Sequence, residues 1–143
     1  MTAHDASDPK QALRASIAER VRGVRTFARA VRAERLAATV LRAPALAGAR
    51  LVLCYRAMPD EIDVDPLVRA LAARGVRVAF PHVTDKGAMW MYAIDSREPL
   101  APRFWVRDRY GIAAPDREAP GVARVFPREI DAVVVPGRAF DAR

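Results

Sequence analysis

The chain has 143 residues, of which 52% are hydrophobic and 29% charged, and its formal net charge is +7. The length suits one domain, and the composition is that of a globular protein rather than a disordered one. No apolar run reaches the roughly 20 residues needed to cross a bilayer, and residues 1–9 lack the apolar segment of a secretory signal. We therefore expect a cytoplasmic protein with no membrane partner.

The positive charge is spread along the whole chain. Only Lys10 and Lys86 of the 24 basic residues are lysines, so the high isoelectric point reflects a general preference for arginine. No dense basic run and no aromatic-rich RNA-binding signature is present, which argues against a nucleic-acid partner. An anionic small molecule remains compatible with this charge.

Two helices are predicted before the first strand. Asp8 can cap the first helix and Pro9 suits its first turn, and apolar residues then recur at helical spacing at Leu13, Ile17, Val21 and Val24. The second helix is expected over residues 31–41, ending before Pro44. Residues 1–8 are expected to form a disordered tail in front of a single domain that spans residues 9–143.

A strand, a helix and a second strand follow. The apolar run at residues 50–55 predicts a strand in which Cys54 packs in the core. A helix is expected over residues 64–73, ended by Gly75, and a strand over residues 76–80. This order predicts a right-handed parallel crossover.

The remaining elements complete the predicted sheet. Residues 89–94 read as a strand, residues 99–120 as an irregular proline-rich segment over one edge of the sheet, and residues 133–135 as a buried strand that ends at Pro136-Gly137. Together these elements predict a Rossmann-like three-layer α/β domain with a mostly parallel sheet. In such sheets, ligands bind beyond the carboxyl ends of the strands.

Lys10 and Arg14 lie four residues apart, on one face of the first predicted helix. Cations at a helix N-terminus oppose the macrodipole, and like charges at this spacing repel each other by a few tenths of a kcal/mol. A mild local conflict of this kind is where a functional constraint tends to show. The pair is either a phosphate grip beside free helix N–H groups or a solvated helix face.

Acidic residues gather after the first predicted strand, at Asp60, Glu61, Asp63 and Asp65. Asp63 and Asp65 suit the N-terminus of the next helix, where carboxylates complement the dipole. Glu61 precedes that helix, and it either caps the turn or contacts a ligand. The sequence has no glycine-rich phosphate fingerprint, no nucleophile elbow and no paired Cys/His set, so no metal ligand is assigned.

Six segments in order resemble the 5-formyltetrahydrofolate cyclo-ligase (methenyltetrahydrofolate synthetase) family. They are Lys10-Gln-Ala-Leu-Arg14, Met58-Pro-Asp-Glu-Ile-Asp63, Arg74-Gly-Val-Arg-Val-Ala-Phe-Pro81, Met89-Trp-Met91, Tyr110-Gly-Ile112 with Pro115, and Val135-Pro-Gly-Arg-Ala-Phe-Asp141. Each segment is weak alone, but six in sequence at sensible spacing are specific.

The resemblance implies an ATP- and Mg²⁺-dependent ligase that converts 5-formyltetrahydrofolate to 5,10-methenyltetrahydrofolate. Matched position by position, Lys10 and Arg14 would contact the ATP phosphates, and Arg56 and Glu61 would line the folate site. For Asp141, a turn-structuring role is as acceptable as a catalytic one. The partners expected are therefore small molecules, and the protein is expected to be a monomer.

Two departures from the family pattern stand out. Ala114 replaces the acid that the family usually has before the proline of the Tyr-Gly-Ile segment. The family also continues after Phe-Asp with a glycine-rich segment that would carry the nucleotide loop and the metal ligands, and the sequence ends before it. We therefore expect a domain that is incomplete at the C-terminus, with an uncovered sheet edge that favours self-association. The alternative to an active ligase is a catalytically dead fragment that binds folate or nucleotide.

Overall fold

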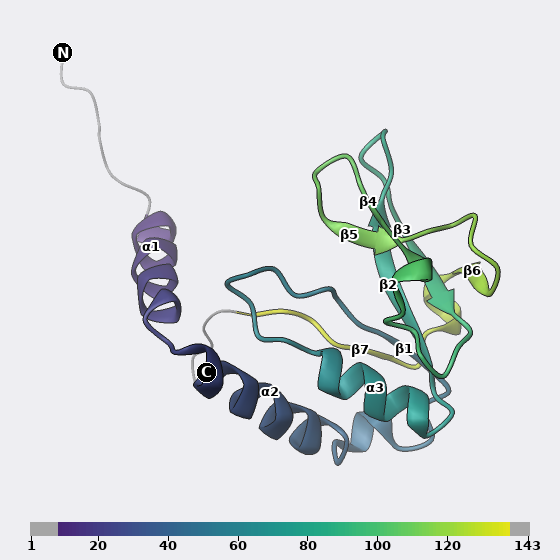
Figure 1. Cartoon of the computed structure of the whole chain (residues 1–143), viewed down its shortest axis with the longest axis horizontal. Helices are drawn as coiled ribbons and strands as arrows, with labels where there is room; N and C mark the ends of the chain where they lie inside the picture. The colour runs from purple at the N-terminus through teal and green to yellow at the C-terminus, as the bar shows by residue number, and fades with distance from the viewer. Residues whose placement is uncertain (1–8, 138–143) are drawn as a thin grey trace.

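The computed structural model describes residues 9–137. Two helices come first, α1 (Pro9–Arg22) and α2 (Thr26–Val40), followed by a short 3₁₀ turn, η1 (Pro44–Leu46). Both predicted helices are confirmed, although α2 begins five residues earlier than expected. In Figure 1, α2 lies along the body of the molecule while α1 stands away from it. Accordingly α1 buries no residue, and Leu13 in its apolar stripe is 58% exposed.

The predicted parallel crossover is confirmed. Strand β1 (Leu51–Leu53) leads through α3 (Asp65–Ala73) to β2 (Arg77–Val83), and β1 pairs in parallel with β2, with Leu53 opposite Ala79. Gly75 separates α3 from β2 at a φ of 78°, in the left-handed region that favours glycine. The strand, helix and strand of the crossover therefore lie close to the ranges that the apolar runs and Gly75 predicted.

The sheet itself is mixed. Its five strands lie in the order β6–β3–β2–β1–β7, with β3 (Met89–Ile94), β6 (Val122–Val125) and β7 (Ala132–Val133) completing it. Strand β1 pairs in parallel with both of its neighbours, whereas β3 is antiparallel to β2 and to β6. The expectation of a mostly parallel sheet is therefore wrong.

The reversal at β3 has a local cause. Residues 84–88 form a tight turn between β2 and β3, in which the Gly87 amide donates to the Thr84 carbonyl and Gly87 has a φ of 80°. A connection this short can only join antiparallel strands, because a parallel pair needs a crossover of a dozen or more residues. The sequence predicted the strand at residues 89–94 but not its direction.

The proline-rich segment is more regular than expected. After a 3₁₀ turn, η2 (Pro102–Phe104), strands β4 (Trp105–Arg107) and β5 (Ala113–Pro115) form a two-stranded antiparallel sheet. The Trp105 ring packs edge-on against Phe80 of β2 with ring centroids 4.8 Å apart. This hairpin therefore lies over one face of the main sheet rather than along its edge.

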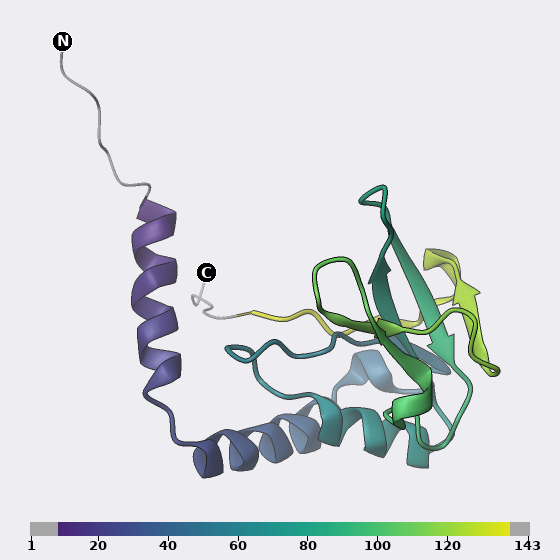
Figure 2. The same ribbon diagram turned by 45° about the horizontal axis from the view of Figure 1, so that its top comes forward.

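One face of the sheet carries the main core. Helices α2 and α3 both pack there, as Figure 2 shows, and their side chains meet strand residues such as Val52 and Phe80 in one buried cluster. Cys54 belongs to this cluster, and burial raises the pKa of its thiol to about 12. The prediction that Cys54 is a core residue is confirmed.

The opposite face has no helix against it among residues 9–137. Its buried cluster consists of the strand residues Leu51, Ala79, Ala93 and Val125, with Ile130 among the half-buried residues packed beside them. Val133, which lies opposite Leu53 on this face, is 55% exposed, and Val135 is 72% exposed. The part of the chain that the structure describes thus has helices on one face of the sheet only, and the predicted third layer is not present in it.

Asp131 joins the two parallel strands β1 and β7. Its Oδ2 atom accepts hydrogen bonds from the backbone amides of Arg50, at 2.7 Å, and Leu51, at 2.9 Å. These amide donors hold the pKa of the Asp131 carboxyl below its usual value, because they favour the ionised form. Asp131, which directly precedes β7, thereby holds the start of β1 beside β7.

We expect Asp131→Asn to lower the melting temperature at pH 7, since the amide oxygen is a weaker acceptor than the carboxylate. A depressed folded-state pKa gives stability that is present above the ordinary carboxyl pKa and is lost as pH falls through the folded value. The difference from wild type should therefore shrink on acidification. Thermal unfolding between pH 2 and pH 7 measures it, with Asp95→Asn, an exposed carboxylate, as control. A difference that persists unchanged to the lowest pH would contradict the assignment.

The exposed side chains of Val133, in β7, and Val135, just after it, predict self-association. Replacing Val133 and Val135 with threonine keeps β-propensity but removes apolar surface. Sedimentation velocity should show concentration-dependent association of the wild type and less of it in the double variant. Val106→Thr, on β4, serves as control because Val106 is also exposed. A wild-type chain that stays monomeric at all concentrations would refute this expectation.

Candidate functional site: a pocket at the carboxyl end of β1

A pocket of about 600 Å³ lies between α2 and the loop that follows β1. This volume is within the range of sites that hold one small organic ligand. Its lining comes from the end of α1, the first half of α2, the loop after β1, the start of α3 and the segment after β7: Val21, Val24, Thr26, Arg29, Ala30, Arg32, residues 56–63, Asp65 and Gly137. The pocket thus lies where the parallel strands β1 and β7 end, as the sheet topology predicted.

The loop of residues 56–63 is held by its own hydrogen bonds. The Glu61 Oε2 atom accepts from the Met58 amide at 2.9 Å, and the Glu61 amide donates to the Met58 carbonyl at 2.9 Å. At the end of the loop, the Tyr55 hydroxyl donates to the Ile62 carbonyl at 2.8 Å. Burial, reinforced by the nearby Glu61 charge, raises the pKa of Tyr55 to about 12, so the hydroxyl stays a donor at all physiological pH values.

Helix α2 braces the same loop from the other side. Arg29 donates to the Pro59 carbonyl, and also to the Glu61 carbonyl at 3.2 Å. These acceptors are neutral, so the guanidinium keeps its full charge at the pocket wall. Arg29 therefore fixes the loop position and contributes a cation.

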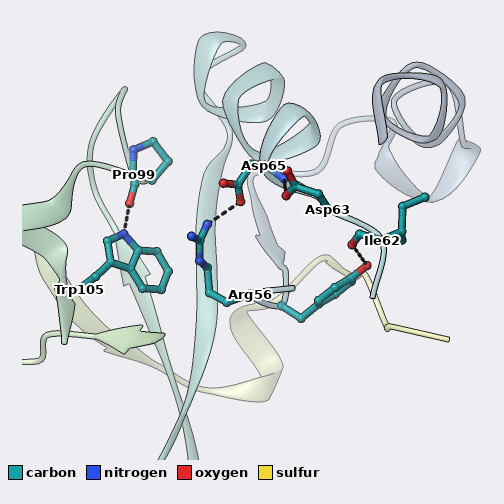
Figure 3. Close-up of polar contacts among 7 residues, drawn as sticks. Arg56, Ile62, Asp63, Asp65, Pro99 and Trp105 are labelled. Carbon is teal, nitrogen blue, oxygen red and sulfur yellow. Dashed lines mark hydrogen bonds and ion pairs between the residues drawn. The ribbon is translucent and has the colours of Figure 1, made fainter. Parts of the chain in front are cut away.

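Arg56 is held between an acid and an aromatic ring. Its Nη1 atom donates to Asp65 Oδ1 at 2.5 Å, and its guanidinium carbon lies 4.7 Å from the centre of the Trp105 ring. Trp105 is itself oriented by a hydrogen bond from its indole N–H to the Pro99 carbonyl, at 3.0 Å. Figure 3 shows Arg56 between these two partners, at the start of the loop.

Asp65 is the residue that links this site to α3. Its backbone amide donates to Asp63 Oδ1 at 2.9 Å, so Asp63 has the structural role at the helix start that the sequence predicted for it. Burial raises the pKa of Asp65 above its usual value, and the neighbouring Arg56 only partly opposes that shift. The ionised form of Asp65 therefore costs folding free energy, even beside Arg56.

The two walls of the pocket differ in charge. The α2 wall presents Arg29 and Arg32, while the loop and α3 present carboxylates at Asp60, Glu61, Asp63 and Asp65. Within residues 9–137, Arg32 makes no hydrogen bond and no ion pair, and it is exposed. The pocket is therefore basic along the helix and acidic along the loop.

The structure brings two of the four predicted site residues together. Arg56 and Glu61 both line the pocket. Lys10 and Arg14 share α1, as expected, but they lie in its first turns, and α1 reaches the pocket only through its last turn, at Val21. Figures 1 and 2 both show the N-terminal end of α1 pointing away from the rest of the molecule. The structure therefore places Lys10 and Arg14 outside the lining of the pocket that holds Arg56 and Glu61, and Asp141 lies outside the described residues.

Sequence reasoning missed three residues of the site: Arg29, Arg32 and Trp105. The two arginines are three positions apart on one helix, but arginine is so frequent in this chain that the spacing carries no distinguishing signal. Trp105 lies in the segment that was read as irregular. Only the fold brings it against Arg56.

Among residues 9–137, no group of three or more His, Cys, Asp and Glu side chains could hold a metal ion. The described helices also include none that is long and apolar enough to cross a membrane.

Comparison with known proteins identifies the class. Residues 6–143 match the profile of the 5-formyltetrahydrofolate cyclo-ligase family, and the chain belongs to this family. Among solved structures, it is similar to the NMR structure of Aquifex aeolicus 5,10-methenyltetrahydrofolate synthetase, with a TM-score of 0.75 and 23% identity. That match covers 92% of this chain and 62% of the solved chain. No curated protein matches the sequence significantly.

We expect Asp65→Asn to leave folding stability at pH 7 unchanged or slightly raised. A raised folded-state pKa means that the native state binds the proton more tightly, so the contribution of Asp65 to stability falls as pH rises through the window above the ordinary carboxyl pKa. The amide removes that pH dependence and the cost of the partly buried charge, and ion pairs that water can reach have a small net value. Urea unfolding of both proteins from pH 3 to pH 7 measures it. A loss of more than about 2 kcal/mol in the variant would instead show that the ion pair stabilises the fold.

Proposed function

We propose that the protein acts on 5-formyltetrahydrofolate, and that the pocket between α2 and the loop after β1 is its folate site. Family membership supports the substrate class. The observation that carries the assignment of the pocket is the position of Arg56 and Glu61, which line one cavity of suitable size on a loop braced at several points. A loop fixed before the ligand arrives loses little conformational entropy on binding.

The proposed reaction is the ATP-dependent cyclisation of 5-formyltetrahydrofolate to 5,10-methenyltetrahydrofolate, with release of ADP and phosphate. The formyl oxygen takes the γ-phosphoryl group of ATP, which turns a poor leaving group into a good one. The N10 nitrogen then attacks the formyl carbon, and the carbon–oxygen bond breaks as phosphate leaves. Catalysis of this kind depends on positioning and on neutralising charge.

Within this proposal, the pocket residues bind and orient the substrate. The Glu61 carboxylate has one oxygen bonded to the Met58 amide, and its Oε1 atom accepts no hydrogen bond within residues 9–137, so it can accept one from a ligand N–H group. Arg56 presents a fixed guanidinium between Asp65 and Trp105. Lys10 and Arg14 are proposed ATP contacts by resemblance alone, since both lie outside the pocket lining. Magnesium is assigned to no described residue.

A second candidate is a protein that binds folate without turnover. It is favoured by the position of Lys10 and Arg14 in the first turns of α1, outside the residues that line the pocket. Both candidates require the folate pocket. They differ only in whether the phosphoryl group is transferred.

Isothermal titration with 5-formyltetrahydrofolate tests the pocket that both candidates share. We expect Glu61→Gln to weaken binding roughly 10-fold or more, since hydrogen bonds to charged groups contribute about 1.5–3 kcal/mol. Glu129→Gln is a matched control, because Glu129 Oε2 accepts from the Phe126 amide at 2.7 Å in the same local arrangement, outside the pocket.

Adding ATP and magnesium and following the methenyl product by its absorbance then separates the two candidates. Product formation supports the ligase, and binding without product supports the second candidate. If the wild type, Glu61→Gln and Glu129→Gln bind 5-formyltetrahydrofolate with equal affinity, Glu61 does not contact the ligand. If the wild type does not bind it at all, the proposal is refuted for this chain.

A further inference from the structure

The positive and negative side chains of the pocket lie on opposite walls, and this separation restricts the orientation of an asymmetric ligand. The basic wall is α2, with Arg29 and Arg32, and the acidic wall is the loop that carries Glu61 and Asp63. A ligand with an anionic end and a donor-rich end binds such a pocket in one orientation, because the reverse orientation places like charges together.

The three arginines of the pocket are not equivalent. Arg56 is neutralised by Asp65 at 2.5 Å, and Arg29 is occupied by the carbonyls of Pro59 and Glu61. Arg32 alone among them lines the pocket without a hydrogen bond or an ion pair in the described part of the chain. Arg32 lies one helical turn beyond Arg29, on the same side of α2. Arg29 already holds the loop through the Pro59 and Glu61 carbonyls, so Arg32 is not needed for that role.

A guanidinium group is suited to a planar carboxylate, which it binds through two parallel hydrogen bonds. The loop opposite is lined with carboxylates, so an incoming carboxylate is repelled there and attracted to α2. The donor groups of a reduced pterin, its amino group and ring N–H groups, have the opposite preference and match the oxygen of Glu61 that is not bonded to Met58.

We infer that Arg32 binds the glutamate carboxylate of the folate substrate, so that the pterin ring lies against the loop after β1 and the glutamyl end lies along α2. This inference rests on the proposed folate function and adds the orientation of the ligand and the residue that recognises its acidic end. Arg32 is a specificity-determining residue for the glutamyl group. It has no part in holding the pterin ring.

The test compares two ligands by isothermal titration, 5-formyltetrahydrofolate and its glutamate diamide, in which both carboxylates are replaced by neutral amides. The wild type should bind the carboxylate ligand about 10-fold more tightly or better, and Arg32→Gln should abolish that preference while leaving the affinity for the diamide unchanged. Arg35→Gln is the matched control, since Arg35 lies on the same helix and does not line the pocket. It should retain the wild-type preference.

Other outcomes overturn the inference in distinguishable ways. Equal wild-type affinity for the two ligands, or equal loss of both in Arg32→Gln, would refute the assignment of Arg32 and leave the folate site intact. A loss in Arg32→Gln that appears only when ATP is the ligand would show that Arg32 recognises phosphate. If the wild type binds neither pterin ligand, the proposed function fails together with this inference.

Discussion

The bracing of one loop determines the candidate site. Residues 56–63 leave the sheet at the end of β1 and must reach the start of α3, and an irregular segment of this length has many conformations in isolation. Arg29 fixes its middle from α2, Tyr55 fixes its end, and Arg56 ties its beginning to Asp65. Contacts to α2, to α3 and to Tyr55 thus hold the loop in one conformation, and the pocket is the space left between the loop and α2.

This arrangement has an energetic cost at Asp65. The carboxylate is partly buried, and burial outweighs the favourable effect of Arg56 on its pKa. A pocket built for catalysis or binding commonly keeps charges where folding alone would not favour them, because the ligand needs them there. We interpret the Arg56–Asp65 pair as a device that orients Arg56, and Trp105 as the flat surface that limits its motion.

Much of the fold could be predicted from the sequence, and the misses have local causes. The β1–α3–β2 crossover follows from apolar runs bounded by glycine and proline, and it is present as predicted. The direction of β3 was missed, although the connection at residues 84–88 is too short to join parallel strands. The strands β4 and β5 were missed because proline obscures short strands, even though Pro115 lies at the end of an edge strand that needs no amide there.

The site was predictable only in part. Glu61 was predicted from its position after the first strand, and both Glu61 and Arg56 from the family resemblance. Both residues line the pocket. The approach of α2 to that loop depends on how the helices pack on one face of the sheet, which no local pattern encodes. For the same reason, the separation of Lys10 and Arg14 from the pocket was not predictable, because helical spacing fixes which residues share a face of α1 but not where α1 points.

The most direct test of this account is a map of amide chemical shifts in the ¹⁵N-labelled protein during titration with 5-formyltetrahydrofolate. The account predicts that the perturbed amides cluster in residues 56–63 and in the first half of α2, around Arg29 and Arg32. Perturbations confined to the opposite face of the sheet or to the β4–β5 hairpin, with none in that loop, would contradict it.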